Sequence, residues 1–176
     1  MKIIYADTHD FKNIINTVSV GDKILLSGPV YTARDAAHKR FFELIDNNSP
    51  LPFDLEGSTI YYAGPTNAPK NLPIGSCGPT TSSRMDAYAP KLLDLGLACM
   101  IGKGQRSKQV CDAVVRNKAL YLCAIGGADA LAAKHIISCE IIAFDDLGCE
   151  SVKKLEFKDF PLIVAIDSNG NNIFYH

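Results

Sequence analysis

Three segments of this sequence place a cation close to glycine or proline. Arg34 lies in TARDAAHKR, Arg84 in GSCGPTTSSRMD and Lys103 in GKGQRS. A guanidinium group can grip a carboxylate through two parallel hydrogen bonds, and an ammonium group can stabilise negative charge that builds up during a reaction. If the fold brings these three side chains together, we expect them to bind a small polyanion, for which a dicarboxylate is the best match.

The segment around Arg84 is typical of the start of a helix. Glycines and a proline lead into a run of hydroxyl residues, Thr80 to Ser83, any of which could cap a helix that begins there. The N–H groups of such a helix would attract an anion, and Arg84 in its first turn would oppose the helix dipole unless an anion were bound. The alternative is a capped helix in which Arg84 pairs with Asp86 or a neighbouring carboxylate. These residues alone favour neither.

Arg34 and His38 are predicted to share one face of another helix. Thr32 suits the N-cap, which puts Arg34 early in the helix and His38 one turn later on the same side. His38, Thr80 and Thr81 are then the groups near the cations that could move a proton. Taken alone, this segment would instead favour a solvated helix face with a surface histidine.

Lys103 stands between Gly102 and Gly104 at the end of an apolar run. Glycines let the backbone approach a ligand closely and leave the ammonium group able to reach it. A phosphate-binding P-loop is excluded, because the spacing from Gly96 is one residue too long and neither Ser nor Thr follows the lysine. We therefore expect Lys103 to bind the same small anion as the two arginines.

Short apolar runs that end in glycine alternate with helical patterns along the chain. Strands are expected at 23–28, 59–64, 98–102 and 120–127, and helices at 33–45, 82–95, 110–118 and 128–137. This repetition predicts an α/β fold with a mixed, largely parallel sheet, in which the carboxyl ends of the strands meet at a ligand-binding edge. Asn169 and Gly170 predict a terminal antiparallel hairpin, and residues 66–73 a loop.

Composition indicates the class of protein. With 176 residues, of which 47% are hydrophobic, the chain fits a single globular domain over residues 1–176. A formal net charge of −1 gives no overall basic field, so we expect neither nucleic acid nor a membrane surface as partner. No apolar stretch approaches the roughly 20 residues of a membrane helix, and the first residues turn polar too soon for a signal peptide, which predicts a cytoplasmic protein.

The cysteines are expected to be reduced thiols. They are spread through apolar segments, as Cys77, Cys99, Cys111, Cys123, Cys139 and Cys149. No two of them have the C-x2-C spacing that is typical of metal sites, so we expect this chain by itself to bind neither a metal nor a cluster. Most of them should be small buried side chains.

Taken in order, several motifs resemble one protein family. The motifs ARDAAH, YYAGP, IGSCGPTTSSRMDAY, GKGQRS and DLGCESVKKLEFKDFP, followed by D-x-x-G-N, are similar to the β subunit, or C-terminal half, of class I fumarases and the related L-tartrate dehydratases. The resemblance covers nearly the whole chain and implies a swivelling β/β/α domain of three layers. It also implies a hydro-lyase subunit of the tricarboxylic acid cycle that is inactive alone. Its partner in a hetero-oligomer would be an α subunit whose three cysteines hold a catalytic [4Fe–4S] cluster, with one iron open to substrate.

The same resemblance implies roles for the residues singled out above. Thr80 is similar to the catalytic base at the substrate carbon, and Thr81 to a substrate-binding hydroxyl beside it. Arg34, Arg84 and Lys103 resemble the residues that hold the two carboxylates of fumarate and stabilise the electron-rich intermediate. A threonine is a poor base at its ordinary pKa, so this role requires nearby cations that stabilise its alkoxide.

His38 is the histidine of the A-R-D-x-x-H pattern, which implies an acid–base group or a residue that orients one. Cys77 departs from the pattern, and it could either contact the site or only fill space. Two other functions stay open: the β subunit of an L-tartrate dehydratase, and a non-enzymic regulatory domain that binds anions through the same cationic turns. We favour fumarate hydration, since Ala33 and the run GKGQRSKQV are more similar to fumarase segments than to tartrate dehydratase segments.

Overall fold

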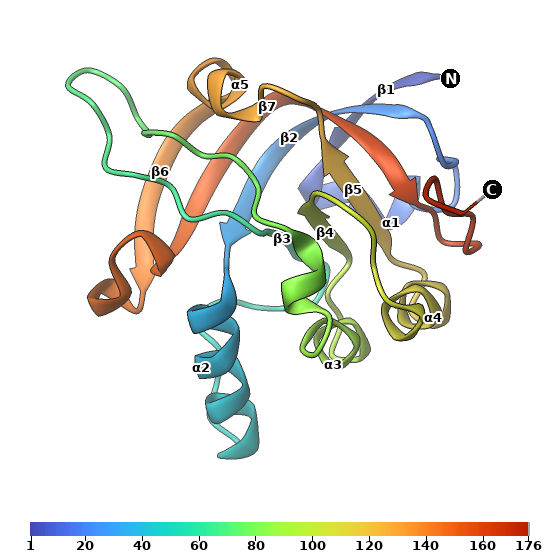
Figure 1. The fold of residues 1–176 in the computed structure, drawn as a ribbon, viewed down its shortest axis with the longest axis horizontal. Coiled ribbons are helices and arrows are strands. Elements are labelled where there is room, and N and C mark those ends of the chain that lie inside the picture. The colour runs from blue at the N-terminus through green and yellow to red at the C-terminus, as the bar shows by residue number, and fades with distance from the viewer. Residues whose placement is uncertain (176) are drawn as a thin grey trace.

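The computed structural model describes residues 1–175, which form a mixed α/β domain (Figure 1). The elements in chain order are β1 (Ile3–Asp7), η1 (Thr8–Asp10), α1 (Phe11–Ile14), β2 (Lys23–Thr32), α2 (Asp35–Asp46), β3 (Thr59–Tyr61), η2 (Ser82–Met85), α3 (Ala89–Asp94), β4 (Cys99–Gly102), α4 (Lys108–Arg116), β5 (Leu120–Ala124), α5 (Ala128–His135), β6 (Ile136–Ala143), η3 (Asp145–Glu150) and β7 (Val152–Ile166). The elements labelled η are 3₁₀ helices.

The strands belong to one sheet that closes on itself. Strands β1 to β5 pair in parallel and in chain order. Strand β7 then runs antiparallel to β5, to β6 and to almost the whole of β2. Because β2 pairs with β3 on one edge and with β7 on the other, strands β2, β3, β4, β5 and β7 form a closed ring. The expected sheet of mixed direction is confirmed, whereas the sequence patterns did not predict its closure into a small barrel.

A paired irregularity bends the two long strands, β2 and β7. Their register shifts between Leu26 and Gly28. Gly28 has a φ of +103° and Asp159, on β7, has a φ of +50°. Ser27 fastens the bend, because its hydroxyl oxygen accepts a hydrogen bond from the Asp159 N–H at 2.9 Å. Bulges increase the bending and twist of strands, and a closed sheet requires both.

Two apolar clusters lie on the two faces of the sheet. One face of the ring strands joins α1 and α5 in the first cluster, which fills the barrel and includes Leu26 and Leu122. The opposite face of β3, β4 and β5 packs against α2, α3 and α4 in the second cluster, which includes Phe41 and Met100. In Figure 1 these three helices lie together on one side of the sheet. The ends of β2, β3 and β4 are therefore held between the barrel core and a layer of helices.

The helix expected at 82–95 is not continuous. Ser82–Met85 form a 3₁₀ turn, and α3 begins only at Ala89, with Pro90 in its first turn. Proline is tolerated in the first turn of a helix but cannot continue one, because it lacks an N–H group and clashes with the preceding turn. The prediction that the hydroxyl run opens a helix with an anion-binding N-terminus is therefore wrong.

The expected N-cap of the preceding helix is also wrong. Thr32 is the last residue of β2, and Arg34 occupies the N-cap position of α2. The Thr32 hydroxyl is used by the neighbouring strand instead: it accepts the Lys153 N–H at 3.1 Å and donates to the Ser151 carbonyl at 3.4 Å. This places Arg34 at the junction between strand and helix.

The other expected elements form with shifted ends. Helices α2, α4 and α5 and strands β2 to β5 overlap the expected ranges, and residues 66–73 are irregular as predicted. The turn at Asn169 and Gly170 forms as well, but one isolated bridge, between Ile166 and Asn172, takes the place of the expected second strand. Within residues 1–175, none of the helices has the length and apolar character that crossing a membrane requires.

Candidate functional site

A polar cleft lies where the parallel strands β2, β3 and β4 end. It has a volume of about 300 Å³ and is lined by Arg34, Gly64, Thr66, Ser76, Gly78, Pro79, Thr80, Thr81, Lys103 and Asp129. Arg34 follows β2, Gly64 follows β3 and Lys103 follows β4. The structure therefore brings Arg34, Lys103 and the two threonines together, as expected for residues at the carboxyl ends of neighbouring parallel strands.

The sheet itself holds the two threonines in place. The Thr80 N–H donates to the Tyr62 carbonyl at 2.7 Å, next to the end of β3. Thr81 forms an isolated parallel bridge with Lys103, next to the end of β4. The backbone of the hydroxyl segment is thus fixed to two strand ends, and no helix N-terminus is needed to position it.

Close packing explains two glycines of this region. A Cβ atom at Gly102 would overlap the Ser82 hydroxyl, and one at Gly78 would lie 2.7 Å from a carboxylate oxygen of Asp129. Gly104 differs, since it has a φ of +83° and open space where a Cβ atom would stand. The glycines that suggested an anion-binding loop therefore let the hydroxyl segment approach β4 and α5.

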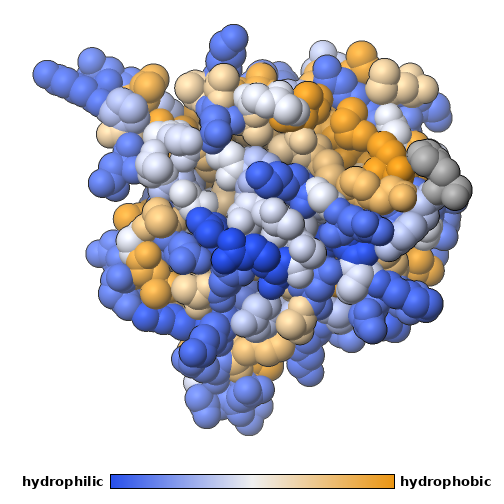
Figure 2. Space-filling view, in the orientation of Figure 1, coloured by the Kyte–Doolittle hydropathy of each residue, from blue (hydrophilic) through white to orange (hydrophobic). Residues whose placement is uncertain are grey.

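Arg34 and Lys103 are the cations of the cleft, and among the described residues only Arg34 has a carboxylate partner, at the outer limit of ion-pair distance. Arg34 Nε lies 4.0 Å from the nearest carboxylate oxygen, that of Glu150, and among the described residues this buried nitrogen has no hydrogen-bond partner. Lys103 forms no ion pair within residues 1–175. Figure 2 shows hydrophilic side chains gathered across the middle of this face, over η2 and the N-terminal end of α2. Because unpartnered buried donors are costly, the arrangement favours a bound anion.

Asp129 is a cleft residue that the sequence patterns did not reveal. It lies in the first turn of α5 and accepts a hydrogen bond from Ser76 Oγ at 2.7 Å. A carboxylate in a cleft that also holds two cations can accept a proton or the hydrogen of a substrate hydroxyl group. Its signal in the sequence is weak, because an acidic residue just after a glycine pair commonly serves only to favour the helix dipole.

Arg84 is not among the residues that line the cleft. Its guanidinium group pairs with Asp35 at 2.7 Å, in the first turn of α2, and 53% of its side chain is exposed. This is the alternative in which a neighbouring carboxylate satisfies Arg84. The structure therefore does not bring all three expected cations into one cleft, and Arg84 lies beside the segment that carries Arg34.

His38 is fully buried and does not line the cleft. Its Nδ1 lies 2.8 Å from the Arg34 carbonyl oxygen, and because a carbonyl only accepts, Nδ1 carries the hydrogen. The ring packs against Phe41, Tyr62 and Tyr88, and Nε2 has no partner among the described residues. Burial lowers the pKa of His38 to about 4. The surface alternative is thus excluded, and the geometry is consistent with a residue that orients the backbone of Arg34.

The burial of His38 should make the stability of the fold depend on pH. Its pKa is lower in the folded protein than in the unfolded chain, so the unfolded state binds the proton first as the pH falls. We expect the free energy of unfolding to fall by about 3 kcal/mol as the pH drops from the ordinary histidine range to the folded pKa. Urea titrations at several pH values measure this loss. His38→Gln should remove most of it, whereas replacement of the partly buried His135 should not. Equal pH dependence in both variants would contradict the assignment.

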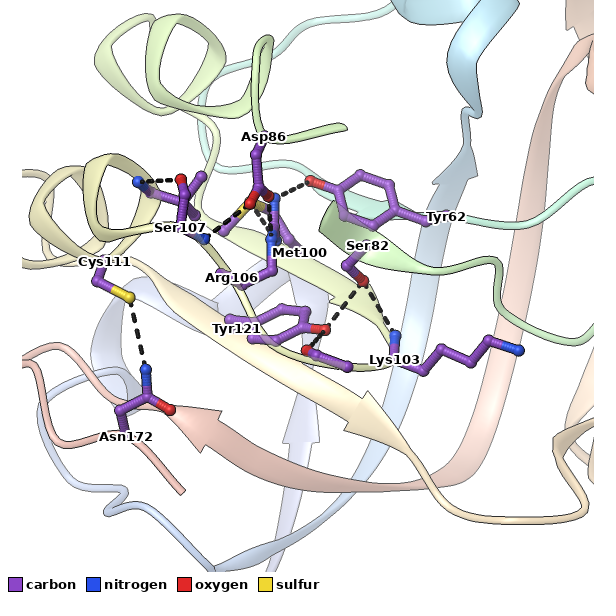
Figure 3. A network of polar contacts seen from close by, with 12 residues as sticks. Tyr62, Ser82, Asp86, Met100, Lys103, Arg106, Ser107, Cys111, Tyr121 and Asn172 are labelled. Atoms are coloured by element: carbon purple, nitrogen blue, oxygen red, sulfur yellow. Dashed lines mark hydrogen bonds and ion pairs between the residues drawn. The ribbon is translucent and has the colours of Figure 1, made fainter. Parts of the chain in front are cut away.

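A buried ion pair next to the cleft was also not predicted. Arg106 is only 1% exposed, and its Nε donates to Asp86 Oδ1 at 2.7 Å. Its Cζ lies 5.2 Å and 4.8 Å from the ring centroids of Tyr62 and Tyr121. Figure 3 shows this cluster, with the side chain of Lys103 directed away from it. In the motif GKGQRS the lysine therefore lines the cleft, whereas the arginine is buried in the core.

The thiols do not form a metal site in the part of the chain that is described. Within residues 1–175, no group of three or more His, Cys, Asp and Glu side chains could hold a metal ion. Cys77 is 1% exposed and belongs to the barrel core, and burial raises its pKa to about 12. Of the two possibilities open for Cys77, the structure therefore favours the one in which it fills space.

Similarity to known proteins extends over the whole chain. The family described as Fumarase C-terminus matches residues 1–176. Fumarate hydratase 2 of Leishmania major is 42% identical over 157 residues, which are 88% of this chain and 28% of that protein. The putative L(+)-tartrate dehydratase subunit beta of Methanocaldococcus jannaschii is 40% identical over 169 residues, or 93% of this chain and 87% of that protein. For the L(+)-tartrate dehydratase subunit beta of Escherichia coli K12, the identity is 36% over 165 residues, with coverages of 90% and 80%.

The two kinds of relative differ in how much of them the chain covers. It spans less than a third of the length of the fumarate hydratase, at 28%, but most of each β subunit, at 87% and 80%. In the longer protein the matched region is thus one portion of a larger chain, and in the shorter ones it is nearly the whole subunit.

Proposed function

This chain belongs to the family of the fumarase C-terminus, and on that basis we propose that it is the β subunit of a class I fumarate hydratase, which adds water to fumarate reversibly to give L-malate. The observation that carries the proposal is the cleft in which Arg34 and Lys103 accompany two threonine hydroxyls, while among residues 1–175 no carboxylate lies within ion-pair distance of Lys103. Two cations match the two carboxylates of a small dicarboxylate. A volume of about 300 Å³ suits a ligand of that size.

The residues of the cleft can be assigned to steps of this reaction. Removing a proton from a carbon next to a carboxylate builds a doubly charged aci-carboxylate, and fixed cations lower its free energy. Arg34 and Lys103 hold the carboxylates and supply that positive charge. Thr80 takes the proton from the substrate carbon during dehydration and returns it during hydration, because the cations stabilise its alkoxide. Thr81 donates a hydrogen bond to the bound substrate.

In this proposal a partner α subunit holds the [4Fe–4S] cluster and supplies the rest of the substrate site. The thiols of this chain do not fit a cluster: burial raises the pKa values of Cys77 and Cys99, and among residues 1–175 no three suitable donors lie together. The names of the two β subunits that this chain covers almost completely support a place in a larger complex. The proposed protein is thus a hetero-oligomeric iron–sulfur enzyme of the cytoplasm that catalyses a step of the tricarboxylic acid cycle.

A swivelling β/β/α architecture is part of the same proposal. The closed sheet supplies two β layers, and α2, α3 and α4 supply a layer of helices outside it. This arrangement supports the three-layer description. A rigid barrel with its cleft at one edge could turn as a unit and present the cleft to a partner.

Dehydration of L-tartrate is the second candidate. It is favoured by the tartrate dehydratase β subunits, which resemble this chain over most of their own length. L-Tartrate has one more hydroxyl group than L-malate, and Asp129 in the cleft could accept its hydrogen. The reaction class and the roles of the cations are the same for both candidates.

Reconstitution tests the proposed function. The chain alone, supplied anaerobically with iron and sulfide, should bind no stoichiometric cluster and show no turnover, whereas the chain assembled with a cluster-binding α subunit should hydrate fumarate. Fumarate, mesaconate and L-tartrate are assayed side by side, because a preference for tartrate would favour the second candidate. A cluster and turnover in the chain alone would refute the two-subunit proposal. Anion binding without turnover in the assembled pair would instead favour a non-enzymic regulatory domain.

Lys103→Met in the assembled pair should lower kcat/KM by ~10²–10³-fold, because it removes a fixed cation that stabilises developing negative charge. The matched control is Lys108→Met. Lys108 lies on the exposed surface of α4, pairs with Asp112 at 2.7 Å and does not line the cleft, so its loss should leave the rate unchanged. Equal rates for the two variants would remove Lys103 from the proposed site.

A further inference from the structure

Ser82 joins the two segments that carry the proposed catalytic groups. Its N–H donates to the Lys103 carbonyl at 3.0 Å, and its hydroxyl oxygen accepts the Lys103 N–H, also at 3.0 Å. Ser82 is 0% exposed and is not among the residues that line the cleft. It follows Thr80 and Thr81 directly in the chain. A single buried residue therefore fixes the hydroxyl segment to the backbone of the lysine.

Tyr121 completes this connection. Its phenol oxygen lies 2.9 Å from Ser82 Oγ and 2.8 Å from the Gly104 carbonyl oxygen. Because that carbonyl can only accept, the phenol hydrogen points to Gly104, and the Ser82 hydroxyl then donates its own hydrogen to the phenol oxygen. Burial raises the pKa of Tyr121, so the phenol keeps its hydrogen. The chain of hydrogen bonds from the Lys103 N–H to the Gly104 carbonyl is thus continuous, as Figure 3 shows around Ser82 and Tyr121.

The backbone around Lys103 needs such a constraint. Lys103 is flanked by Gly102 and Gly104, the residue type with the largest conformational freedom. Gly102 cannot carry a side chain, because a Cβ atom there would overlap Ser82 Oγ. The hydrogen bond between Ser82 Oγ and the Lys103 N–H therefore requires glycine at position 102, and the same bond restrains the backbone freedom that this glycine allows. Misplacing a catalytic group by about 1 Å can cost ~10²-fold in rate.

We propose that Ser82 and Tyr121 are positioning residues, whose hydrogen bonds fix the Lys103 ammonium group relative to the Thr80 hydroxyl without touching substrate. This inference rests on the proposed function. It differs from a purely structural role, in which the two hydroxyl groups would only provide hydrogen-bond partners for each other in the core. A structural role predicts a loss of stability alone. A positioning role predicts a loss of rate that exceeds what the loss of stability explains.

Tyr121→Phe and Ser82→Ala in the assembled pair test the proposal. Each variant should lower kcat by ~10- to 100-fold, and the double variant should cost little more than either single one, because both substitutions break the same chain of hydrogen bonds. The matched control is Tyr62→Phe. Tyr62 is equally buried and packs against the same Arg106 guanidinium group. Within residues 1–175, however, the one hydrogen bond of its hydroxyl is accepted from Arg106 Nη2, at 3.3 Å. Its kcat should be unchanged.

Amide hydrogen exchange supplies a readout that does not depend on activity. In the chain alone, the Lys103 N–H should exchange at least ~10-fold faster in Ser82→Ala and Tyr121→Phe than in the unchanged protein or in Tyr62→Phe. The positioning role would be overturned by an active pair whose Tyr121→Phe variant keeps its kcat within about twofold while the Lys103 amide loses protection. An unchanged Lys103 amide in both variants would overturn the hydrogen-bond chain itself. An inactive unchanged pair would overturn the proposed function instead, and the exchange data would still report whether Ser82 holds Lys103.

Discussion

Thr80→Val is expected to lower turnover of the assembled pair by ~10²–10⁴-fold while KM changes little. Valine keeps the branched shape of threonine, and the Thr80 N–H bond to the Tyr62 carbonyl, at 2.7 Å, does not involve the side chain. The substitution therefore removes the hydroxyl group from the cleft and leaves the backbone that carries it. Arg34 and Lys103 are unchanged, so substrate should still bind. Steady-state kinetics on fumarate and L-malate measure both parameters.

Two further variants separate the loss of a proton-moving group from a general disturbance of the cleft. Thr80→Ser retains a hydroxyl group and should recover most of the rate. Thr81→Val removes the neighbouring hydroxyl, which is proposed only to bind substrate, and should raise KM more than it lowers kcat. A near-normal rate for Thr80→Val would exclude Thr80 as the base. Asp129, the carboxylate that lines the same cleft, would then be the next candidate for the base.

Arg106→Met is expected to lower the free energy of unfolding by ~3–5 kcal/mol, because it leaves Asp86 next to the core without its cation. The Arg106 side chain is 0% exposed and that of Asp86 is 15% exposed, so water replaces little of the lost interaction. One hydrogen bond to the carboxylate remains, from the Ser107 N–H at 2.7 Å. Urea denaturation of the chain, followed by circular dichroism, measures the change.

A surface pair provides the matched control for this prediction. Arg116 Nε and Nη2 lie 3.0 Å and 3.1 Å from the two carboxylate oxygens of Asp94, and both side chains are about half exposed. Arg116→Met should therefore cost less than about 1 kcal/mol. Adding Asp86→Asn to Arg106→Met should restore part of the lost stability, since the amide carries no charge. If Arg106→Met costs no more than Arg116→Met, the buried pair does not stabilise the fold.

Strands β2 to β5 and helices α2, α4 and α5 could be predicted because their signals are local. Whether consecutive residues are buried or exposed sets the alternating pattern along β2 and the apolar runs that end in glycine, so a short stretch of sequence is enough to recognise a strand. The partner of a strand is a different matter, since pairing between β2 and β7 depends on segments far apart in the chain. The first part of β7 contains KKLEFKD, whose charges conceal a strand that is buried at every second or third position. The prediction of one helix over 82–95 was wrong for a local reason: Pro90 lies in the first turn of α3 and could not have occupied the interior of a longer helix.

The site could be predicted in part for a similar reason. Arg34 and Lys103 both follow strands of a parallel sheet, and topology alone brings such positions to one edge. Arg84 was expected to join Arg34 and Lys103 in the cleft, but its expected position depended on a helix that does not form there. Its guanidinium group forms an ion pair with Asp35 instead. The flanking glycines indicated a ligand-binding role for Lys103, but nothing in the local sequence indicates that Arg106, three residues later, is buried. That burial comes from the rings of two tyrosines on other strands or their ends, which only the folded chain brings together.

The long ladder between β2 and β7 also affects how the protein can be made in the cell. Lys23 pairs with Ile163 and Tyr31 with Lys154, so one edge of β2 has no partner until β7 has been synthesised. Closing so large a loop costs chain entropy before the new contacts stabilise it, and folds of this kind form slowly. A ribosome that adds residues from the N-terminal end must therefore release most of the domain before its ring can close. Throughout that interval the nascent chain exposes an open strand edge, which is the type of surface that chaperones protect from aggregation.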